Sequence, residues 1–158
     1  MTGPDQFFVV PPDSAGARTA MSSYFAELDD RFPEGFDATA ALEEAVDAFR
    51  PPAGLFVVAG DPTSPSACGG IAFLDADRAE VRRMWVAPAS RGRGLASRLL
   101  GHLEQLAADE GRTTVLLDTH RVLHEAQALY LKNGYTAVAR YNTNPHAAHW
   151  FAKQLPAS

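Results

Sequence analysis

The spacing of apolar residues predicts two helices in the first third of the chain. In both segments apolar side chains recur every three or four positions, as on the buried face of a helix. Asp13 and Asp37 precede these segments and carry side chains suited to cap a helix N-terminus. The predicted apolar faces consist of Ala17, Met21, Tyr24, Phe25 and Leu28 in the first helix and of Leu42, Ala45, Val46 and Phe49 in the second.

Elsewhere the chain alternates between strand and helix patterns. Runs rich in β-branched and aromatic residues, bounded by turn residues, predict seven strands. Two further helices are expected, from Leu95 to about Gly111 and from Val122 to Asn133. The resulting order, βααβββαβαββ, predicts an α/β fold with one sheet flanked by helices. The predicted strands are residues 6–10, 55–60, 67–74, 80–86, 115–118, 135–141 and 147–155.

Length, charge and cysteine content narrow the class of protein. With 158 residues, 46% of them apolar, the chain is expected to form one domain, residues 1–158. A net charge of −5 argues against nucleic acid as a partner. The single cysteine, Cys68, excludes an internal disulfide and is interpreted as a core residue. His146 and His149 are weak evidence for metal, so no metal is expected.

The sequence carries no targeting signal that we recognise. The first residues lack the basic and apolar regions of a signal peptide, and no apolar run is long enough to span a bilayer. The cytoplasm is therefore the expected compartment, without a membrane partner, and both a monomer and a homodimer stay open.

The stretch from Glu80 to Leu100 contains the clearest candidate chemistry, in the order strand, glycine turn and helix. Two glycines let a ligand approach the backbone of the turn. The helix N-terminus offers unpaired N–H groups, and arginines add positive charge. These features predict a phosphate or pyrophosphate site, with a plain cationic surface turn as the alternative. The turn is Arg91-Gly92-Arg93-Gly94, and the basic cluster assigned to it is Arg82, Arg83, Arg91, Arg93 and Arg98.

Two segments carry motifs of a known kind. The first is Arg91-Gly92-Arg93-Gly94-Leu95-Ala96, which fits the signature Arg/Gln-x-x-Gly-x-Gly/Ala, with Met84-Trp85-Val86-x-Pro88 before it and Leu99-Leu100 after it. The second is Ala126-x-x-Leu129-Tyr130-x-Lys132-x-Gly134-Tyr135. They resemble motifs A and B of the GNAT superfamily of acyl-CoA-dependent N-acetyltransferases. The resemblance covers about residues 68–138 and implies the fold of that family, a mixed, mostly antiparallel central sheet flanked by helices.

The resemblance implies acetyl-CoA as cosubstrate and direct transfer of its acetyl group to an amine. Backbone amides of the turn are expected to bind the pyrophosphate. The strand before the turn is expected to pair with the pantetheine arm like an added strand, where the two central strands of the family splay apart. The expected cofactor-binding residues are Met84, Trp85, Val86, Arg91, Gly92, Arg93, Gly94, Leu95, Ala96 and Ser97.

Glu80 is the candidate general base. The period of two in a strand places it on the same face as Met84 and Val86. It precedes Arg91 by eleven residues, which is the spacing of the base glutamate in the histone-acetylating branch of the family. A partly dry cleft raises the pKa of a glutamate towards the range of a general base. A solvated carboxylate paired with an arginine and a base acting through a chain of waters are the alternatives.

Tyr130 is the candidate general acid because it occupies the position of the motif B tyrosine. Its phenol can donate a proton to the departing CoA thiolate, and a tyrosine packed in the core is the alternative. Motif B often has an asparagine where this chain has Leu123. That departure removes one expected polar contact to the pantetheine arm.

The acceptor pocket of the family forms between the first two helices and the last strands. An arginine there can clamp a carboxylate and Glu27 can attract an amine, which suits an amino-acid-like or other small amine. Solvated loop side chains are the alternative for each residue. The substrate-binding candidates are Tyr24, Glu27, Thr119, Arg121, Arg140, Asn142 and His149, with Phe32, Tyr141 and Asn144 beside them.

The expected function is N-acetylation of a small-molecule amine. A protein or peptide N-acetyltransferase is the first alternative, and a non-catalytic acyl-CoA-binding module is the second. A wide groove would favour a protein substrate, whereas a closed aromatic pocket would favour a small amine.

Overall fold

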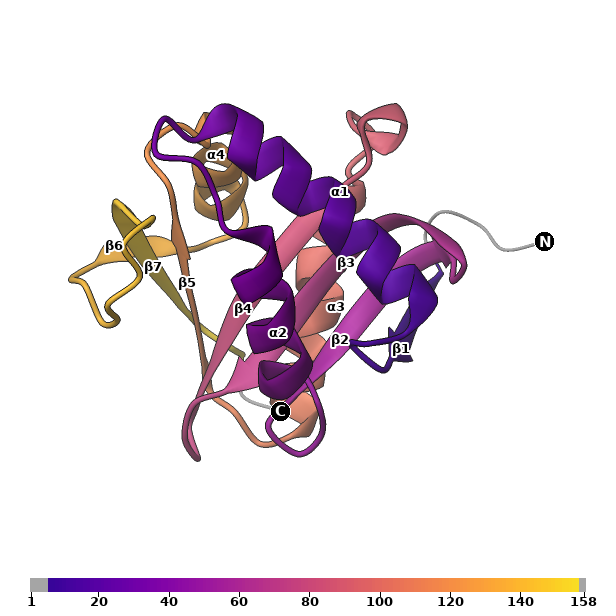
Figure 1. The fold of residues 1–158 in the computed structure, drawn as a ribbon. Helices are drawn as coiled ribbons and strands as arrows, with labels where there is room; N and C mark the ends of the chain where they lie inside the picture. Colours follow the sequence, from indigo (N-terminus) through magenta and orange to yellow (C-terminus); the bar gives the residue numbers. More distant parts are fainter. Residues whose placement is uncertain (1–5, 157–158) are drawn as a thin grey trace.

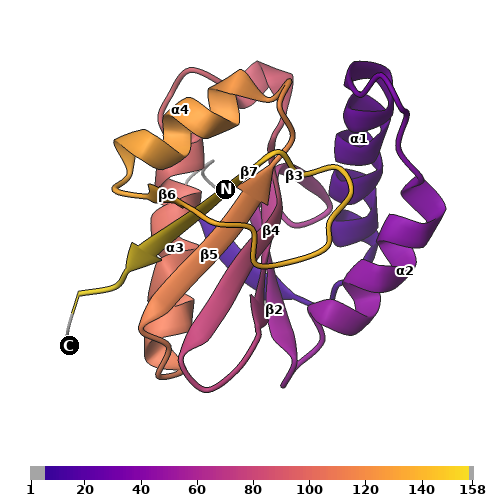
Figure 2. The same ribbon diagram turned by 90° about the vertical axis from the view of Figure 1, so that its left-hand side faces the viewer.

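A seven-stranded sheet lies between two pairs of helices in the computed structural model, which describes residues 6–156 (Figure 1). Helices α1 and α2 lie on one side of the sheet, and α3 and α4 lie on the other (Figure 2). The predicted order βααβββαβαββ is confirmed, with one 3-10 turn, η1, added before α3. The elements are β1 (Phe7–Val10), α1 (Ala15–Arg31), α2 (Ala38–Ala48), β2 (Gly54–Asp61), β3 (Ser64–Phe73), β4 (Arg78–Val86), η1 (Pro88–Ser90), α3 (Leu95–Asp109), β5 (Thr114–Thr119), α4 (His124–Lys132), β6 (Thr136–Val138) and β7 (His149–Gln154).

Side-chain caps determine where the first two helices begin. The hydroxyl of Ser14 accepts a hydrogen bond from the N–H of Ala17 at 3.4 Å, so Ser14 is the N-cap of α1. The prediction that Asp13 caps this helix is wrong, because its carboxylate pairs with Arg50 at 3.2 Å. Asp37 caps α2 as predicted, accepting from a first-turn N–H at 3.0 Å.

The sheet is mixed and mostly antiparallel, as predicted. Its strand order is β1-β2-β3-β4-β5-β7-β6, and β4 and β5 are the parallel neighbours. These two strands pair at Arg78–Glu80 and Thr114–Leu116, whereas β4 continues to Val86 and β5 to Thr119. The backbones of β4 and β5 therefore stop pairing midway along both strands.

Apolar side chains form a core on each face of the sheet. The core under α3 contains Leu99, Leu100 and Leu103 of that helix, and the core under α1 and α2 contains Phe25 and Phe49. Close packing of α2 on β3 requires Gly70, since an added Cβ atom there would lie 2.5 Å from the ring of Phe49.

A β-bulge in β4 interrupts the regular alternation of its side chains. The register of β3 against β4 shifts between Cys68 and Gly70, so Arg83 and Met84 together oppose Gly69. Arg83 has a φ of 58° and is the non-glycine residue with positive φ within residues 6–156. A bulge of this kind moves the following side chains to the opposite face of the strand.

The bulge corrects one prediction about the site. Glu80 pairs with Ala72, which belongs to the core under α1 and α2. Met84 and Val86 instead pack against the core under α3. The prediction that Glu80 shares a strand face with these two residues is therefore wrong, because it assumed a regular strand.

The connection between β6 and β7 extends towards α1 and α2 (Figure 2). Strand β6 is shorter than the predicted 135–141, so residues 139–148 form a loop. In this loop the Nδ1 of His146 lies 3.0 Å from Oε2 of Glu34, which belongs to the α1–α2 connection. The loop thereby closes one side of the space above β4 and β5.

Candidate active site

A cavity of about 930 Å³ follows the diverging halves of β4 and β5. Residues of α1, α2, α4, the turn before α3 and the β6–β7 loop complete its walls. The cavity therefore connects the glycine turn with the carboxylate of Glu80. The predicted site residues that line it are Tyr24, Glu27, Glu80, Met84, Trp85, Val86, Arg91, Gly92, Gly94, Leu95, Ala96, Ser97, Thr119, Tyr130 and Asn142.

Four predicted site residues are not among the residues that line this cavity. The guanidinium of Arg140 lies over the ring of Trp150, 4.7 Å from its centroid. His149 is exposed at the first position of β7, and Arg121 is exposed before α4. The guanidinium of Arg93 bonds to the backbone of its own turn at 3.4 Å.

The turn between β4 and α3 leaves backbone donors without helical partners. Gly92 and Gly94 have φ values of 81° and 76°, a conformation that glycine adopts at little cost. Gly94 is the N-cap of α3, and no side chain caps this helix. The first N–H groups from Leu95 onward therefore lack intrahelical acceptors, and with the helix dipole they favour an anion.

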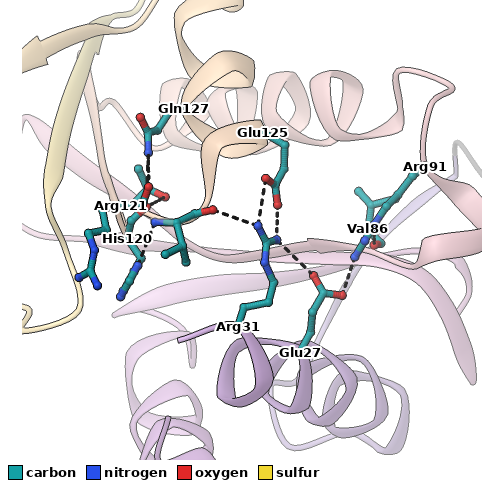
Figure 3. Close-up of polar contacts among 10 residues, drawn as sticks. Glu27, Arg31, Val86, Arg91, His120, Arg121, Glu125 and Gln127 are labelled. Atoms are coloured by element: carbon teal, nitrogen blue, oxygen red, sulfur yellow. Dashed lines mark hydrogen bonds and ion pairs between the residues drawn. The ribbon is translucent and has the colours of Figure 1, made fainter. Parts of the chain in front are cut away.

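Ion pairs connect α1 with this turn and with α4 across the cavity (Figure 3). Arg91 donates to Oε1 of Glu27 at 2.7 Å and to the carbonyl oxygen of Val86 at 2.9 Å. Arg31 bonds to both carboxylate oxygens of Glu125 and lies 3.9 Å from Glu27. Glu27 is thus paired with Arg91 and lies near Arg31 in the free protein.

Glu80 is a buried carboxyl group, with 7% of its surface exposed. Its Oε2 accepts hydrogen bonds from the hydroxyl of Tyr141 at 2.6 Å and from the amide of Asn142 at 3.2 Å. Burial raises the pKa of Glu80 and the charge of Asp118 adds to the rise, against the opposing effect of the two hydrogen bonds. The net upward direction suits a general base.

A second carboxylate, Asp118, is coupled to Glu80 through one amide. The Nδ2 of Asn142 lies 2.6 Å from Asp118 Oδ2 and 3.2 Å from Glu80 Oε2. The Oδ1 of Asn142 accepts from the indole N–H of Trp150 at 2.9 Å, which fixes the orientation of the amide. Asn144 donates to Asp118 at 3.2 Å. The β6–β7 loop thus positions carboxylates that come from two diverging strands.

Tyr130 both packs in the core and lines the cavity. Its ring centroid lies 6.0 Å from that of Tyr135 and 5.8 Å from that of Phe151. Burial raises the pKa of Tyr130, and the charges of Tyr24 and Asp118 raise it further. The phenol therefore keeps its proton at neutral pH and can donate a hydrogen bond into the cavity.

Glu34 accepts hydrogen bonds from two histidines at the edge of the cavity, and we call Glu34, His120 and His146 the histidine clasp. Both contacts to Oε2 of Glu34 measure 3.0 Å. The Nδ1 of His120 accepts from the N–H of Val122 at 3.1 Å, so its Nε2 carries the proton that is donated. Hydrogen bonds, led by that from His146, lower the pKa of Glu34 to about 2. The clasp joins three connecting segments.

Several residues of the cavity were not singled out from the sequence. Asp118 directly follows the buried run Val115–Leu117, and a polar residue at the end of a buried strand could have indicated it. The histidine clasp has no such signal, because His120 lies 86 positions from Glu34. The sequence predicts that Arg82 and Arg83 belong to the basic cluster at the glycine turn, whereas both pair with Glu44 of α2.

Within residues 6–156, no group of three His, Cys, Asp or Glu side chains is arranged to hold a metal ion. Cys68 is buried, burial raises the pKa of its thiol, and the S–H donates to the carbonyl oxygen of Arg83 at 3.4 Å. This contact supports the core role expected for Cys68. No helix in the described range is long and apolar enough to cross a membrane.

The sequence pattern of the acetyltransferase (GNAT) family matches residues 21–135. The matched stretch contains β4, the glycine turn, α3, β5 and α4, which together form most of the cavity. The chain therefore belongs to the acetyltransferase (GNAT) family.

Individual proteins resemble the chain to different extents. An IAA acetyltransferase of Azospirillum brasilense is 36% identical over 81 residues, a match that spans 51% of this chain and only 53% of that relative. A GNAT-family acetyltransferase of Staphylococcus aureus has a TM-score of 0.81 at 15% identity, over 96% of this chain and 100% of the other. An aminoglycoside 6′-N-acetyltransferase complexed with coenzyme A has a TM-score of 0.72 at 18% identity, over 97% and 99%. These two structures share the fold.

Proposed function

We propose that this protein transfers an acetyl group from acetyl-CoA to a primary amine of a small molecule. The observation that supports this most directly is the single cavity that runs from the uncapped N-terminus of α3 to the buried carboxylate of Glu80. It offers an anion site and a candidate base at its two ends. Residues 1–158 act as one acetyltransferase domain in this proposal.

Acetyl-CoA binds with its pyrophosphate on the amides of residues 91–96. Its pantetheine arm lies along β4 where β5 no longer pairs with it, and there it accepts and donates main-chain hydrogen bonds like an added strand. Met84 and Val86 supply the backbone for this pairing, while their side chains stay in the core. The thioester then lies at the gap between the strands, near Glu80.

Glu80 acts as the general base, directly or through one water. Its carboxylate takes a proton from the ammonium group of the substrate, and the neutral amine attacks the thioester carbonyl. A C–N bond forms and the C–S bond breaks. Tyr130 gives its phenolic proton to the departing sulfur and regains one from the nitrogen, while the proton on Glu80 passes to solvent. Both steps are general acid–base catalysis.

The shape of the cavity favours a small substrate over a protein. The histidine clasp holds the β6–β7 loop against the α1–α2 connection, with His146 within 5.3 Å of the ring centroids of Phe32 and Phe36. These contacts narrow the acceptor side, as a closed aromatic pocket would require. The aminoglycoside 6′-N-acetyltransferase with a similar fold is named for a small-molecule substrate, which also supports a small substrate here.

The proposal is tested by measuring CoA release from acetyl-CoA with a panel of small amines and of peptides, for the wild type and for Glu80→Gln. We expect turnover with small amines and a loss of roughly a hundred- to ten-thousand-fold in kcat for Glu80→Gln. The Kd for CoA, measured by calorimetry, should stay unchanged. Turnover limited to peptides would favour the protein N-acetyltransferase instead.

Glu104→Gln is the matched control for Glu80→Gln. Glu104 also accepts a hydrogen bond from a tyrosine, Tyr135, at 2.8 Å, but it does not line the cavity. We expect normal turnover from this variant. Unchanged turnover of Glu80→Gln across pH would assign deprotonation to water alone, and CoA binding without turnover on any amine would favour the non-catalytic module.

A further inference from the structure

Two consecutive arginines of β4 project towards the same helical layer. In a regular strand neighbouring side chains point to opposite faces, but the bulge at Arg83 removes this alternation. The guanidinium of Arg82 lies 5.8 Å from the ring centroid of Phe49, and that of Arg83 lies 5.6 Å from Phe25 and 6.0 Å from Phe36. Both arginines line the cavity on the same side of the sheet as Glu80.

Glu44 of α2 bridges the two guanidinium groups. Its Oε1 bonds to Nη2 of Arg82, and its Oε2 lies 3.5 Å from Nη2 of Arg83. The arginine side chains are 24% and 15% exposed, whereas that of Glu44 is 52% exposed. A half-exposed carboxylate on a surface helix thus neutralises two largely buried cations.

The arginine pair is incompletely hydrogen-bonded within residues 6–156 of the protein. The Nε of Arg83 is buried and donates no hydrogen bond to any of the residues that the structure describes. Arg82 also lies 3.6 Å from Glu80, the proposed general base. When Glu80 takes a proton from the substrate, Arg82 loses one of its negatively charged neighbours. A substrate carboxylate that takes the place of Glu44 would then face the two guanidinium groups from inside the cavity.

We propose that the acceptor amine carries a carboxylate group, which Arg82 and Arg83 bind while the amine lies towards Glu80. This inference rests on the function proposed above and specifies its substrate class as amino acids or related aminocarboxylates. Glu44 occupies the carboxylate position in the free protein and moves outward when substrate binds. The contact between Arg82 and Glu80 requires the amine and the carboxylate to be only a few bonds apart.

The test compares matched amines that differ in one charge, namely a set of L-amino acids and the corresponding amino acid amides. The kcat/KM for CoA release should be at least about tenfold higher for the amino acids, as expected for charge-assisted hydrogen bonds. Arg83→Gln should remove this preference, because the kcat/KM should fall at least about tenfold more for the amino acids than for the amides. Glu44→Gln should lower the KM for amino acids without changing the KM for acetyl-CoA, because a competing anion is removed.

Arg112→Gln is the matched control, since Arg112 also lies over a phenylalanine, 4.4 Å from the ring centroid of Phe73, but outside the cavity. It should keep the preference. Equal or better turnover of the amides or of polyamines, or an equal loss for both sets in Arg83→Gln, would overturn the proposed substrate class while leaving the acetyltransferase function intact.

If no amine is turned over, the proposed function is rejected. The carboxylate site is then tested separately by a binding measurement. Calorimetry with CoA present compares N-acetyl amino acids with their amides. Tighter binding of the N-acetyl amino acids, lost in Arg83→Gln and retained in Arg83→Lys, supports the arginine pair as a carboxylate site. No binding of any panel member, or binding that ignores the carboxylate, overturns it.

Discussion

The phenolic hydroxyl of Tyr141 donates a hydrogen bond of 2.6 Å to Oε2 of Glu80. Burial and the neighbouring carboxylate raise the pKa of Tyr141, so the phenol keeps its proton and stays a donor. A donor to the ionised carboxylate lowers the pKa of Glu80, against the larger effect of burial. The β6–β7 loop therefore moderates the rise in the pKa of Glu80 that burial causes.

Removing this donor should move the pH profile of the enzyme. In Tyr141→Phe the ionised form of Glu80 loses a hydrogen bond, so its pKa rises. A base works only when ionised, and the rise of kcat/KM with pH should shift upward by about one pH unit. Tyr135→Phe removes a similar bond to Glu104 and should leave the profile unchanged. An acidic limb that stays in place in Tyr141→Phe would argue against Glu80 as the base.

Tyr130→Phe should separate catalysis from packing. The ring remains and keeps its contacts with Tyr135 and Phe151, while the proton donor is lost. We expect kcat to fall by roughly a hundred- to ten-thousand-fold, with the thermal midpoint and the Kd for CoA nearly unchanged. Single-turnover kinetics measure the chemical step directly. A normal rate in that assay would leave Tyr130 with the core role alone.

Glu27→Gln should tighten CoA binding, because Arg91 is paired with Glu27 in the free protein and the proposed pyrophosphate site requires its charge. Exposed ion pairs contribute about 0.2–1 kcal/mol, so the Kd for CoA should fall by roughly 1.4- to 5-fold. Glu125→Gln is the control: it breaks the pair with Arg31 across the cavity but leaves that with Arg91. Weaker binding in Glu27→Gln would mean that the ion pair positions Arg91 for the phosphate instead.

Replacing Gly94 or Gly101 with alanine should change the free energy of unfolding in opposite directions. Gly94→Ala forces a side chain into the left-handed region at φ 76° and should cost about 1–2 kcal/mol of unfolding free energy. Gly101 lies inside α3 with open space around it, so Gly101→Ala should stabilise by about 0.5–1 kcal/mol. Urea unfolding measures both. The thermal stabilisation by CoA should shrink only in Gly94→Ala, because the amides of the turn are displaced there.

Local interactions made much of the fold predictable from sequence. Apolar periodicity located the four helices of residues 6–156, and runs of β-branched and aromatic residues between turn residues located the seven strands, because both signals depend on residues close together in the chain. The glycine turn was predictable for the same reason, since positive φ values at Gly92 and Gly94 and the start of a helix are local properties.

The direction of side chains around the site was decided by tertiary structure. A single bulged residue, Arg83, placed Glu80 on the face of the strand opposite to Met84. A prediction that assumes strict alternation of side chains along a strand does not detect such an inserted residue. It also brought Arg82 and Arg83 together against Glu44. No pattern in β4 alone distinguishes this strand from a regular one.

Contacts between distant segments were equally outside the reach of sequence. The amide of Asn142 connects Glu80 with Asp118, residues 62 and 24 positions away, and Glu34 meets His146 across 112 positions. The sequence alone thus determined the elements and the glycine turn before α3, because these depend on neighbouring residues. The tertiary structure decided which carboxylates, arginines and histidines face one cavity, because that depends on how the strands diverge and where the loops return.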